Sequence, residues 1–292
     1  MTNHPTIWNV CGRRLDLSRR GLVMGILNVT PDSFSDGGRF ANVESALKQC
    51  RQMVAEGVDI IDVGGESTRP GAEPVGKEEE LRRTIPVVEA LRAEWDGLIS
   101  IDTSKAVVAE AAMAAGADIV NDVTALRGDE GMGEVCRRTG AGVVVMHMRG
   151  EPRTMQANPQ YENVVEEVRG FFEERFADLT AEGLAEEQLC FDPGIGFGKS
   201  LEHNLTLLKG LDQLVLPGRP LLIGLSRKSF LGKLLGADEV GCREWPTVAL
   251  TAYTREKGAV VHRVHSVKEN REAMRMAEAV MGAQGTCLDW LQ

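Results

Sequence analysis

Short runs of β-branched and other apolar residues return eight times along the chain, each followed by a loop rich in Gly, Pro, Asp, Asn or Ser and then by a helical pattern. Continuous apolar runs of this length are typical of buried strands in a parallel sheet whose faces are covered by helices. The predicted strands are Leu22 to Asn28, Val58 to Val63, Leu98 to Asp102, Asp118 to Asn121, Gly142 to His147, Gln188 to Asp192, Pro220 to Leu225 and Ala259 to His265.

The segments between these runs repeat apolar residues with the period of a helix. From Val43 to Val54, apolar residues recur three or four positions apart and form one stripe. Ala106 to Ala115 consists almost entirely of Ala, Val and Met, and Gly116 follows it as a candidate C-terminal cap. A last helix is predicted after the N-cap residue Ser266, ending at about Met281.

Eight strand and helix units in 292 residues predict an α/β fold, the (β/α)8 TIM barrel. Residues 21 to 282 would form the barrel, and residues 1 to 20 a short N-terminal extension. No linker or low-complexity segment divides the chain, so a single domain over residues 1 to 292 is expected. A doubly wound open sheet remains the alternative, because a count of strands does not show whether the sheet closes.

Composition and charge narrow the possible functions. With 43% hydrophobic residues, the chain can bury a large core without a disulfide or zinc scaffold. Its 33 basic and 43 acidic residues give a net charge of -10, which argues against a nucleic-acid partner and requires any phosphate site to be a local basic cluster. Scattered cysteines and the lack of a long apolar stretch favour a cytoplasmic enzyme with no membrane partner.

Polar side chains stand at the C-terminal end of nearly every predicted strand. The carboxyl ends of parallel barrel strands meet on one face, where the active sites of such barrels lie. Asp, Asn and Ser at these positions also cap following helices, but so many polar ends together favour a site. The residues are Asn28, Asp62, Asp102, Asn121, His147, Asp192, Ser226, Arg227, Lys228, Arg263 and His265.

The chemistry of these residues divides into two groups. One group has the carboxylates and the amide that pair with adjacent N–H donors of a flat, guanidine-like heterocycle, and it consists of Asp102, Asn121 and Asp192. The other group follows the seventh and eighth strands, where barrels frequently bind phosphate, and it consists of Arg227, Lys228, Arg263 and His265. The predicted ligand is a nitrogen heterocycle that carries an anion, with a phosphate ester as the expected anion. For Arg227, a solvated surface charge is an equal alternative.

The segment from Asp192 to Ser200 ends in Gly-Lys-Ser, like a nucleotide P-loop. Its spacing argues against such a loop, because Pro193 stands where the first glycine is needed and removes an N–H donor. The glycines instead predict a backbone that passes close to a flat ligand. His147, between two methionines, is interpreted as a strand end that covers the barrel mouth rather than as a metal ligand.

Six segments of the chain, in their order and spacing, resemble dihydropteroate synthase, an enzyme of folate biosynthesis. The resemblance extends from about Gly21 to Met281, and the first two segments are long and specific. The segments are GILNVTPDSFSDGG from Gly25, DVGGESTRPG from Asp62, SIDTS from Ser100, Asn121-Asp122, DPGIGFGK from Asp192 and SRKS from Ser226.

The resemblance implies a (β/α)8 enzyme that joins (7,8-dihydropterin-6-yl)methyl diphosphate to p-aminobenzoate, releasing diphosphate and forming 7,8-dihydropteroate. A pterin is a flat, guanidine-like heterocycle and its diphosphate is an anion, so both predicted groups of residues suit this substrate. The resemblance also implies a dissociative mechanism, Mg²⁺ as cofactor, inhibition by sulfonamides and a homodimer that uses the last helices.

Roles for individual residues also follow from the resemblance. Those expected to contact the pterin diphosphate are Thr68, Asp102, Asn121, Asp192, Lys228, Arg263, Val264 and His265. Those expected to contact p-aminobenzoate are Phe34, Thr68, Arg69, Pro70, Phe197, Lys228 and Ser229. The expected catalytic residues are Asp102, Lys228, Arg263 and His265, and the expected magnesium ligand is Asn28. The Gly-rich loops at residues 28 to 38 and 64 to 71 are expected to close over the diphosphate.

Two positions depart from the family pattern, and two other functions stay open. Ser266 stands where the family commonly has Asp, and Arg149-Gly-Glu151 stands where it often has Gln-Gly-Thr. The first alternative function is a methyltetrahydrofolate corrinoid methyltransferase on the same barrel, which would not need diphosphate. The second is a non-catalytic paralogue that binds pterins, which turnover would exclude.

Overall fold

The computed structural model describes residues 5–29, 39–67, 72–150, 155–156, 158–236 and 239–282. Its barrel strands are β3 (Leu22–Asn28), β4 (Ile60–Gly64), β5 (Leu98–Asp102), β6 (Ile119–Asp122), β7 (Gly142–Met146), β8 (Leu189–Asp192), β9 (Leu222–Gly224) and β10 (Val261–Val264). Its helices are α1 (Arg39–Ala55), α2 (Lys77–Glu94), α3 (Ala106–Ala114), α4 (Met132–Thr139), α5 (Val164–Ala181), α6 (Leu201–Lys209), α7 (Ser229–Leu235), α8 (Glu244–Glu256) and α9 (Val267–Gly282). All eight predicted strands are confirmed.

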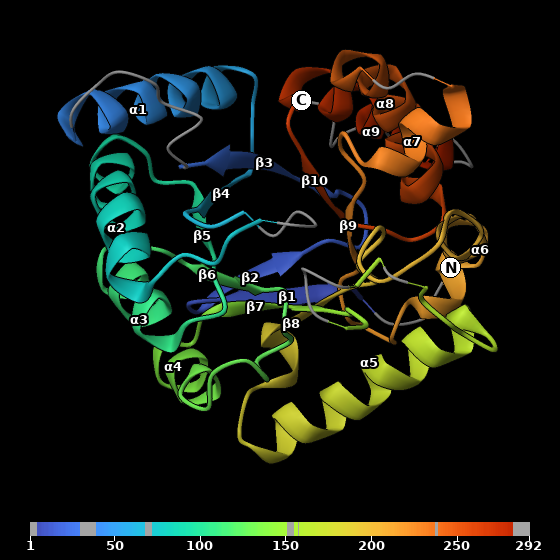
Figure 1. The fold of residues 1–292 in the computed structure, drawn as a ribbon, viewed down its shortest axis with the longest axis horizontal. Coiled ribbons are helices and arrows are strands. Elements are labelled where there is room, and N and C mark those ends of the chain that lie inside the picture. The colour runs from blue at the N-terminus through green and yellow to red at the C-terminus, as the bar shows by residue number, and fades with distance from the viewer. Residues whose placement is uncertain are drawn as a thin grey trace.

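The eight strands form one parallel sheet in the order β8-β7-β6-β5-β4-β3-β10-β9, with the helices around its outside (Figure 1). The two end strands meet through a parallel bridge between Phe191 and Leu221. The N–H of Phe191 also donates to the carbonyl oxygen of Pro220 at 3.0 Å. The sheet therefore closes into the predicted (β/α)8 barrel, and the alternative of an open doubly wound sheet is wrong.

Side chains along each strand alternate between the inside of the barrel and the helices. Near the N-terminal ends of the strands, the inward side chains form an apolar cluster that includes Met24, Ile60, Leu98, Ile119, Val144, Cys190, Leu222 and Val261. The outward side chains form a larger apolar cluster with the helices. On four strands, the residue two positions after an inward apolar residue is polar and faces the same interior. These residues are Asp62, Asn121, Asp192 and Arg263. The barrel interior is thus apolar at one end and polar at the other.

The N-terminal extension is a hairpin of β1 (Ile7–Val10) and β2 (Arg13–Asp16). The fully buried Trp8 joins the apolar cluster inside the barrel, and its Nε1 donates to the carbonyl oxygen of Gln188 at 2.8 Å. The sequence predicted the extension but not its place. The hairpin covers the apolar end of the barrel, so a ligand reaches the interior from the polar end.

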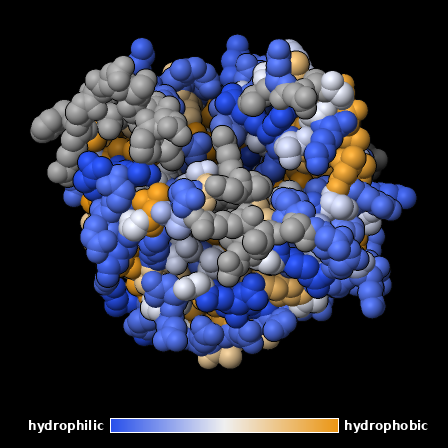
Figure 2. All heavy atoms as spheres, in the orientation of Figure 1, coloured by the Kyte–Doolittle hydropathy of each residue, from blue (hydrophilic) through white to orange (hydrophobic). Residues whose placement is uncertain are grey.

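The outer surface is mostly hydrophilic on the face that Figure 2 shows. This agrees with the burial of most large apolar side chains in the two clusters. Of the helices that the structure describes, none has the length and apolar character needed to cross a membrane.

Replacing Trp8 by alanine is expected to lower the free energy of unfolding by about 3 to 5 kcal/mol, because it removes a large buried side chain and leaves a cavity under the barrel. Trp8→Phe keeps most of the ring but removes the donor to Gln188, so a loss of about 1 to 3 kcal/mol is expected. Urea denaturation measures both values. If both variants were as stable as the unchanged protein, the hairpin would not seal the barrel.

Candidate active site

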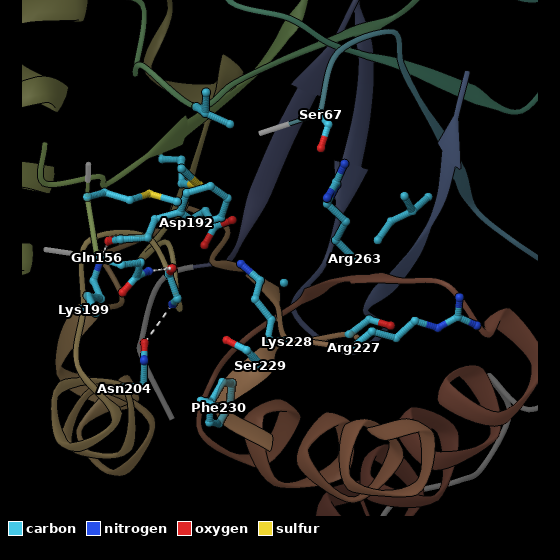
Figure 3. Close-up of a pocket in the computed structure, with 18 of the residues that line it drawn as sticks. Ser67, Gln156, Asp192, Lys199, Asn204, Arg227, Lys228, Ser229, Phe230 and Arg263 are labelled. Atoms are coloured by element: carbon cyan, nitrogen blue, oxygen red, sulfur yellow. Dashed lines mark hydrogen bonds between the residues drawn. The ribbon is translucent and has the colours of Figure 1, made fainter. Parts of the chain in front are cut away.

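A cavity of about 660 Å³ opens at the polar end of the barrel. Its position at the C-terminal ends of the strands is where enzymes of this fold carry their active sites. Eleven of the predicted site residues line it, namely Asn28, Asp102, Asn121, Asp192, Phe197, Ser226, Arg227, Lys228, Ser229, Arg263 and His265. Figure 3 shows part of this lining.

Three predicted residues with described side chains do not line the cavity, namely Asp62, His147 and Val264. Asp62 and His147 are buried. The side chain of Val264 packs in the core between the barrel and the helices, so only its backbone is available to a ligand. The remaining predictions lie outside the residues that the structure describes, and they concern Phe34, Thr68, Arg69 and Pro70.

Arg263 holds two carboxylates together on the floor of the cavity. Its Nε donates to Asp62 Oδ2 at 2.6 Å, and its Nη2 donates to Asp102 Oδ2 at 2.7 Å. Asn121 Nδ2 donates to the same oxygen of Asp62 at 3.2 Å. Asp62 is fully buried, and a buried carboxylate is costly unless a cation and hydrogen bonds compensate it. The planar, multiply donating guanidinium of Arg263 supplies both.

Asp102 has a strongly perturbed environment. Burial raises the pKa of its carboxyl to about 7, against the opposing effect of Arg263, and the charge of Asp62 adds to the rise. The hydrogen bond from Arg263 Nη2 to Asp102 Oδ2 favours the carboxylate form and opposes this effect of burial. A ligand that brought N–H donors or positive charge to Asp102 would favour the carboxylate.

Lys228 and Asp192 face each other across another part of the cavity (Figure 3). Asp192 Oδ1 accepts a hydrogen bond from the N–H of Gly194 at 2.7 Å. Lys228 Nζ lies 4.1 Å from the centre of the Phe197 ring and donates to the carbonyl oxygen of Ile195. Burial raises the pKa of Asp192 and lowers the pKa of Lys228 to about 8. Lys228 is a half-buried cation that lies between an anion and an aromatic ring.

The loop after β9 meets the end of β10 at the rim of the cavity. His265 Nδ1 lies 2.9 Å from Ser226 Oγ, which also accepts from the His265 N–H at 3.2 Å. Arg227 forms an ion pair with Glu244, so it is not a solvated charge alone. Ser266 donates to the second oxygen of that carboxylate at 2.7 Å. The family departure at Ser266 thus gives Glu244 a neutral partner.

The glycines after Asp192 pack mainly against the protein's own chain. A Cβ on Gly194 would lie 2.0 Å from the carbonyl oxygen of His147, and one on Gly198 would lie 2.2 Å from that of Arg149. Both have positive φ angles. Close packing against the segment after β7 requires these two glycines, which corrects the prediction that they serve a flat ligand. Only Gly196 of the three lines the cavity.

His147 lies directly after β7, at the strand end, and is buried. Its ring packs edge-on against Phe171 at 4.9 Å between centroids, and burial lowers its pKa to about 2. Within the described ranges, no three His, Cys, Asp or Glu side chains are grouped so as to hold a metal ion.

Sequence reasoning assigned no role to several residues that shape the cavity. Asp62 was noted only as a strand end, although its spacing from Ile60 places it on the inside of the barrel. Gln156 donates to the carbonyl oxygen of Gly196, and Asn204 Oδ1 accepts from the N–H of Gly196 at 2.8 Å (Figure 3). No local sequence signal marks Gln156 or Asn204, because each acts through a residue distant in sequence.

A family model described as pterin binding enzyme matches residues 24–265, which is most of the chain. The chain therefore belongs to the pterin-binding enzymes. The dihydropteroate synthase of Escherichia coli strain K12 is 48% identical over 275 residues, which cover 94% of this chain and 96% of that protein.

Solved structures agree with this assignment. The Yersinia pestis dihydropteroate synthase, in complex with a sulfonamide drug, has a TM-score of 0.88 and 45% identity, covering 95% of this chain and 100% of that one. The Burkholderia cenocepacia dihydropteroate synthase, in complex with 7,8-dihydropteroate, has a TM-score of 0.86 and 42% identity, covering 97% of this chain and 99% of that one. Among the pterin-binding enzymes, the chain is thus a member of the dihydropteroate synthases.

Arg263→Met is expected to lower the free energy of unfolding by about 3 to 5 kcal/mol, because Asp62 would stay buried without its cation. Adding Asp62→Asn is expected to recover part of this loss, since the uncompensated charge disappears. Urea denaturation of the single variants and the double variant gives the coupling between the two residues. Simple additivity would show that the pair does not determine the stability of the cavity floor.

Proposed function

We propose that the cavity binds a dihydropterin methyl diphosphate next to p-aminobenzoate and that the enzyme joins the two by a dissociative substitution. The observation that carries this proposal is the meeting of carboxylates, an amide and cations in one cavity of about 660 Å³. The Burkholderia relative was solved with 7,8-dihydropteroate, a molecule in which both substrate parts are already joined. Membership of the family favours this function over corrinoid methyl transfer.

The pterin ring would lie against the acidic floor. Asp102 and Asp192 offer carboxylate oxygens to the ring N–H groups, and Asn121 offers an amide that can donate and accept. A charged acceptor makes the stronger hydrogen bond, which suits recognition of a guanidine-like edge. Arg263 already neutralises part of this floor, so the ring does not enter an uncompensated anionic site.

The amine subsite would lie beside Lys228, with Phe197 and Ser229 in its wall. The ring of Phe197 gives an aromatic amine an apolar surface, and the ammonium of Lys228 attracts a carboxylate. The predicted contacts of Phe34, Thr68, Arg69 and Pro70 remain part of this proposal. Since the Yersinia relative was solved with a sulfonamide drug, we propose that sulfonamides occupy the same subsite here.

The diphosphate would lie near Arg263, His265 and the backbone of Val264, and Asn28 would bind Mg²⁺ with its side-chain oxygen. Asn28 lines the cavity, and its amide oxygen is a hard donor of the kind that Mg²⁺ prefers. One such ligand fits, because Mg²⁺ commonly takes its other oxygens from phosphate groups and water. The ion would neutralise charge on the leaving diphosphate.

In the proposed reaction, the bond between the exocyclic methylene carbon and the diphosphate oxygen breaks first, and its electron pair leaves with the diphosphate. The positive charge left on the methylene and the pterin ring is stabilised by the carboxylate of Asp102, an electrostatic effect of a preorganised group. The amine nitrogen of p-aminobenzoate then forms the new carbon–nitrogen bond and loses one proton. No covalent bond to the enzyme forms.

The predicted homodimer and cytoplasmic location remain proposals. Three large apolar side chains on the last two helices, Trp245, Met276 and Val280, are strongly exposed. The helices α8 and α9 that carry them pack against each other, so a second copy could cover these residues together.

Diphosphate release by the purified protein is expected only when the pterin diphosphate and p-aminobenzoate are both present. Lys228→Ala should lower kcat/KM by about 100-fold, because it removes a half-buried cation at the junction of the two subsites. Lys209→Ala, at the exposed end of α6, is the control and should change kcat/KM less than about twofold. Pterin binding without amine-dependent release would identify a binding paralogue instead.

Removal of Mg²⁺ with a chelator is expected to suppress diphosphate release, and added Mg²⁺ to restore it. Asn28→Ala should raise the Mg²⁺ concentration for half-maximal rate by about tenfold, within the range seen when metal-site interactions are removed. Asn28→Asp keeps an oxygen ligand and should preserve the metal requirement near its original level. Full activity in excess chelator would refute the magnesium site.

A further inference from the structure

Lys199 is a buried cation that binds the inner side of the segment from Pro193 to Gly198. Its side chain is almost completely buried. Its Nζ lies 3.0 Å from His147 Nδ1 and donates to the carbonyl oxygens of Gly194 at 3.0 Å and Phe197 at 2.9 Å. A longer contact of 3.3 Å reaches the carbonyl oxygen of His147. The ammonium thus connects two points of the segment to the end of β7.

All four of these contacts are with neutral groups. An ammonium has only donors, so His147 Nδ1 must accept, which places the ring proton on Nε2. The low pKa of His147 keeps the ring neutral. Burial also lowers the pKa of Lys199 itself to about 7, which shows how little solvent compensates the charge. A buried charge with such partners is costly and needs a function beyond solubility.

The carbonyl groups of the segment point to opposite sides. Those of Gly194 and Phe197 accept from Lys199, whereas the carbonyl of Ile195 accepts from Lys228. In Figure 3, Lys199 and Lys228 lie on either side of the cavity wall that this segment forms. The position of Phe197, whose ring lies under the Lys228 ammonium, depends on the same peptide groups.

We infer that Lys199 is a positioning residue for the amine subsite: it holds the segment from Pro193 to Gly198 in the conformation that places Phe197 and the Ile195 carbonyl against Lys228. The inference rests on the proposed function of the cavity and adds a residue whose ammonium is engaged by the protein's own acceptors. Without the ammonium, the carbonyls of Gly194 and Phe197 lose a shared donor. The Gly194 carbonyl keeps only the N–H of Phe197, so the peptide group of Phe197 is less firmly held. Lys228 then loses a fixed acceptor and a fixed aromatic neighbour.

The test compares Lys199→Met, which keeps the length of the side chain without its charge, with Lys199→Arg, which keeps the charge. Lys199→Met is expected to raise the KM for p-aminobenzoate about tenfold, with kcat and the KM for the pterin diphosphate changing less than about threefold. Asp102 and Asn121, which would bind the pterin, lie on β5 and β6, and only Asp192 adjoins the segment, through the N–H of Gly194. Lys199→Arg should recover part of the affinity for p-aminobenzoate.

A matched control distinguishes an effect on the amine subsite from a general loss of stability. Arg255→Met also removes a buried cation, but it lies beside Glu278 and the start of the barrel, where Glu278 accepts from the N–H of Gly21. This variant is expected to melt at a lower temperature with both KM values unchanged. If Arg255→Met raised the KM for p-aminobenzoate as much as Lys199→Met, the effect would follow stability and the inference would be wrong.

A crystal structure of Lys199→Met tests the inference independently of turnover. Displacement of the Ile195 carbonyl and the Phe197 ring from Lys228 would support it, and an unchanged segment would overturn it. If Lys199→Met did not fold, Lys199→Gln, which also removes the charge, would be compared in the same way. Failure of the unmodified protein to release diphosphate would refute the proposed function. The position of the segment in the variant would still show whether Lys199 holds Phe197 and the Ile195 carbonyl against Lys228.

Discussion

Charge compensation inside a closed barrel is the constraint on which the site depends. Asp62, Asp102 and Asp192 lie at the polar end of the barrel, where burial makes an isolated carboxylate costly. Arg263 satisfies two of them through one guanidinium. Removal of the cation or of a carboxylate would leave the opposite charge buried without a partner. The resulting loss of stability is larger than the stability that the intact ion pair contributes. The groups that we propose to bind the substrate are therefore also the groups that hold one another in place.

The alternation of side chains along the strands brings these charges together. Side chains two positions apart on a strand face the same side of the sheet. If one residue of a barrel strand packs inside the barrel next to the hairpin, the residue two positions later also faces the barrel interior. Ile60 and Asp62 show this on β4, and Val261 and Arg263 show it on β10. The hairpin with Trp8 closes the apolar end, so the interior has one opening. The same periodicity thus produces the sealed end and the site.

Much of this arrangement could be predicted from sequence, because the signals are local. Apolar runs marked all eight strands, and a polar residue at a strand end needs only its neighbours to be recognised. The pairing of Arg263 with Asp62 could not be predicted, since it joins residues 201 positions apart. The spacing around Lys199 correctly argued against a nucleotide loop, but the contact of its ammonium with His147 could not be predicted, since it joins residues 52 positions apart. The roles of Phe34 and Thr68 rest on the resemblance alone.

The charge balance also bears on why a divalent cation belongs in the proposed mechanism. In the part of the mouth that the structure describes, Arg263, Lys228 and Lys199 compensate the carboxylates of Asp62, Asp102 and Asp192. Lys233 and Arg243 also line the cavity. Arg227 is engaged by Glu244 and adds no free charge. A diphosphate would therefore meet cations that are partly engaged by carboxylates, although its departure creates a highly charged anion. A magnesium ion held by Asn28 would add positive charge at the leaving group without disturbing the pairs on the cavity floor.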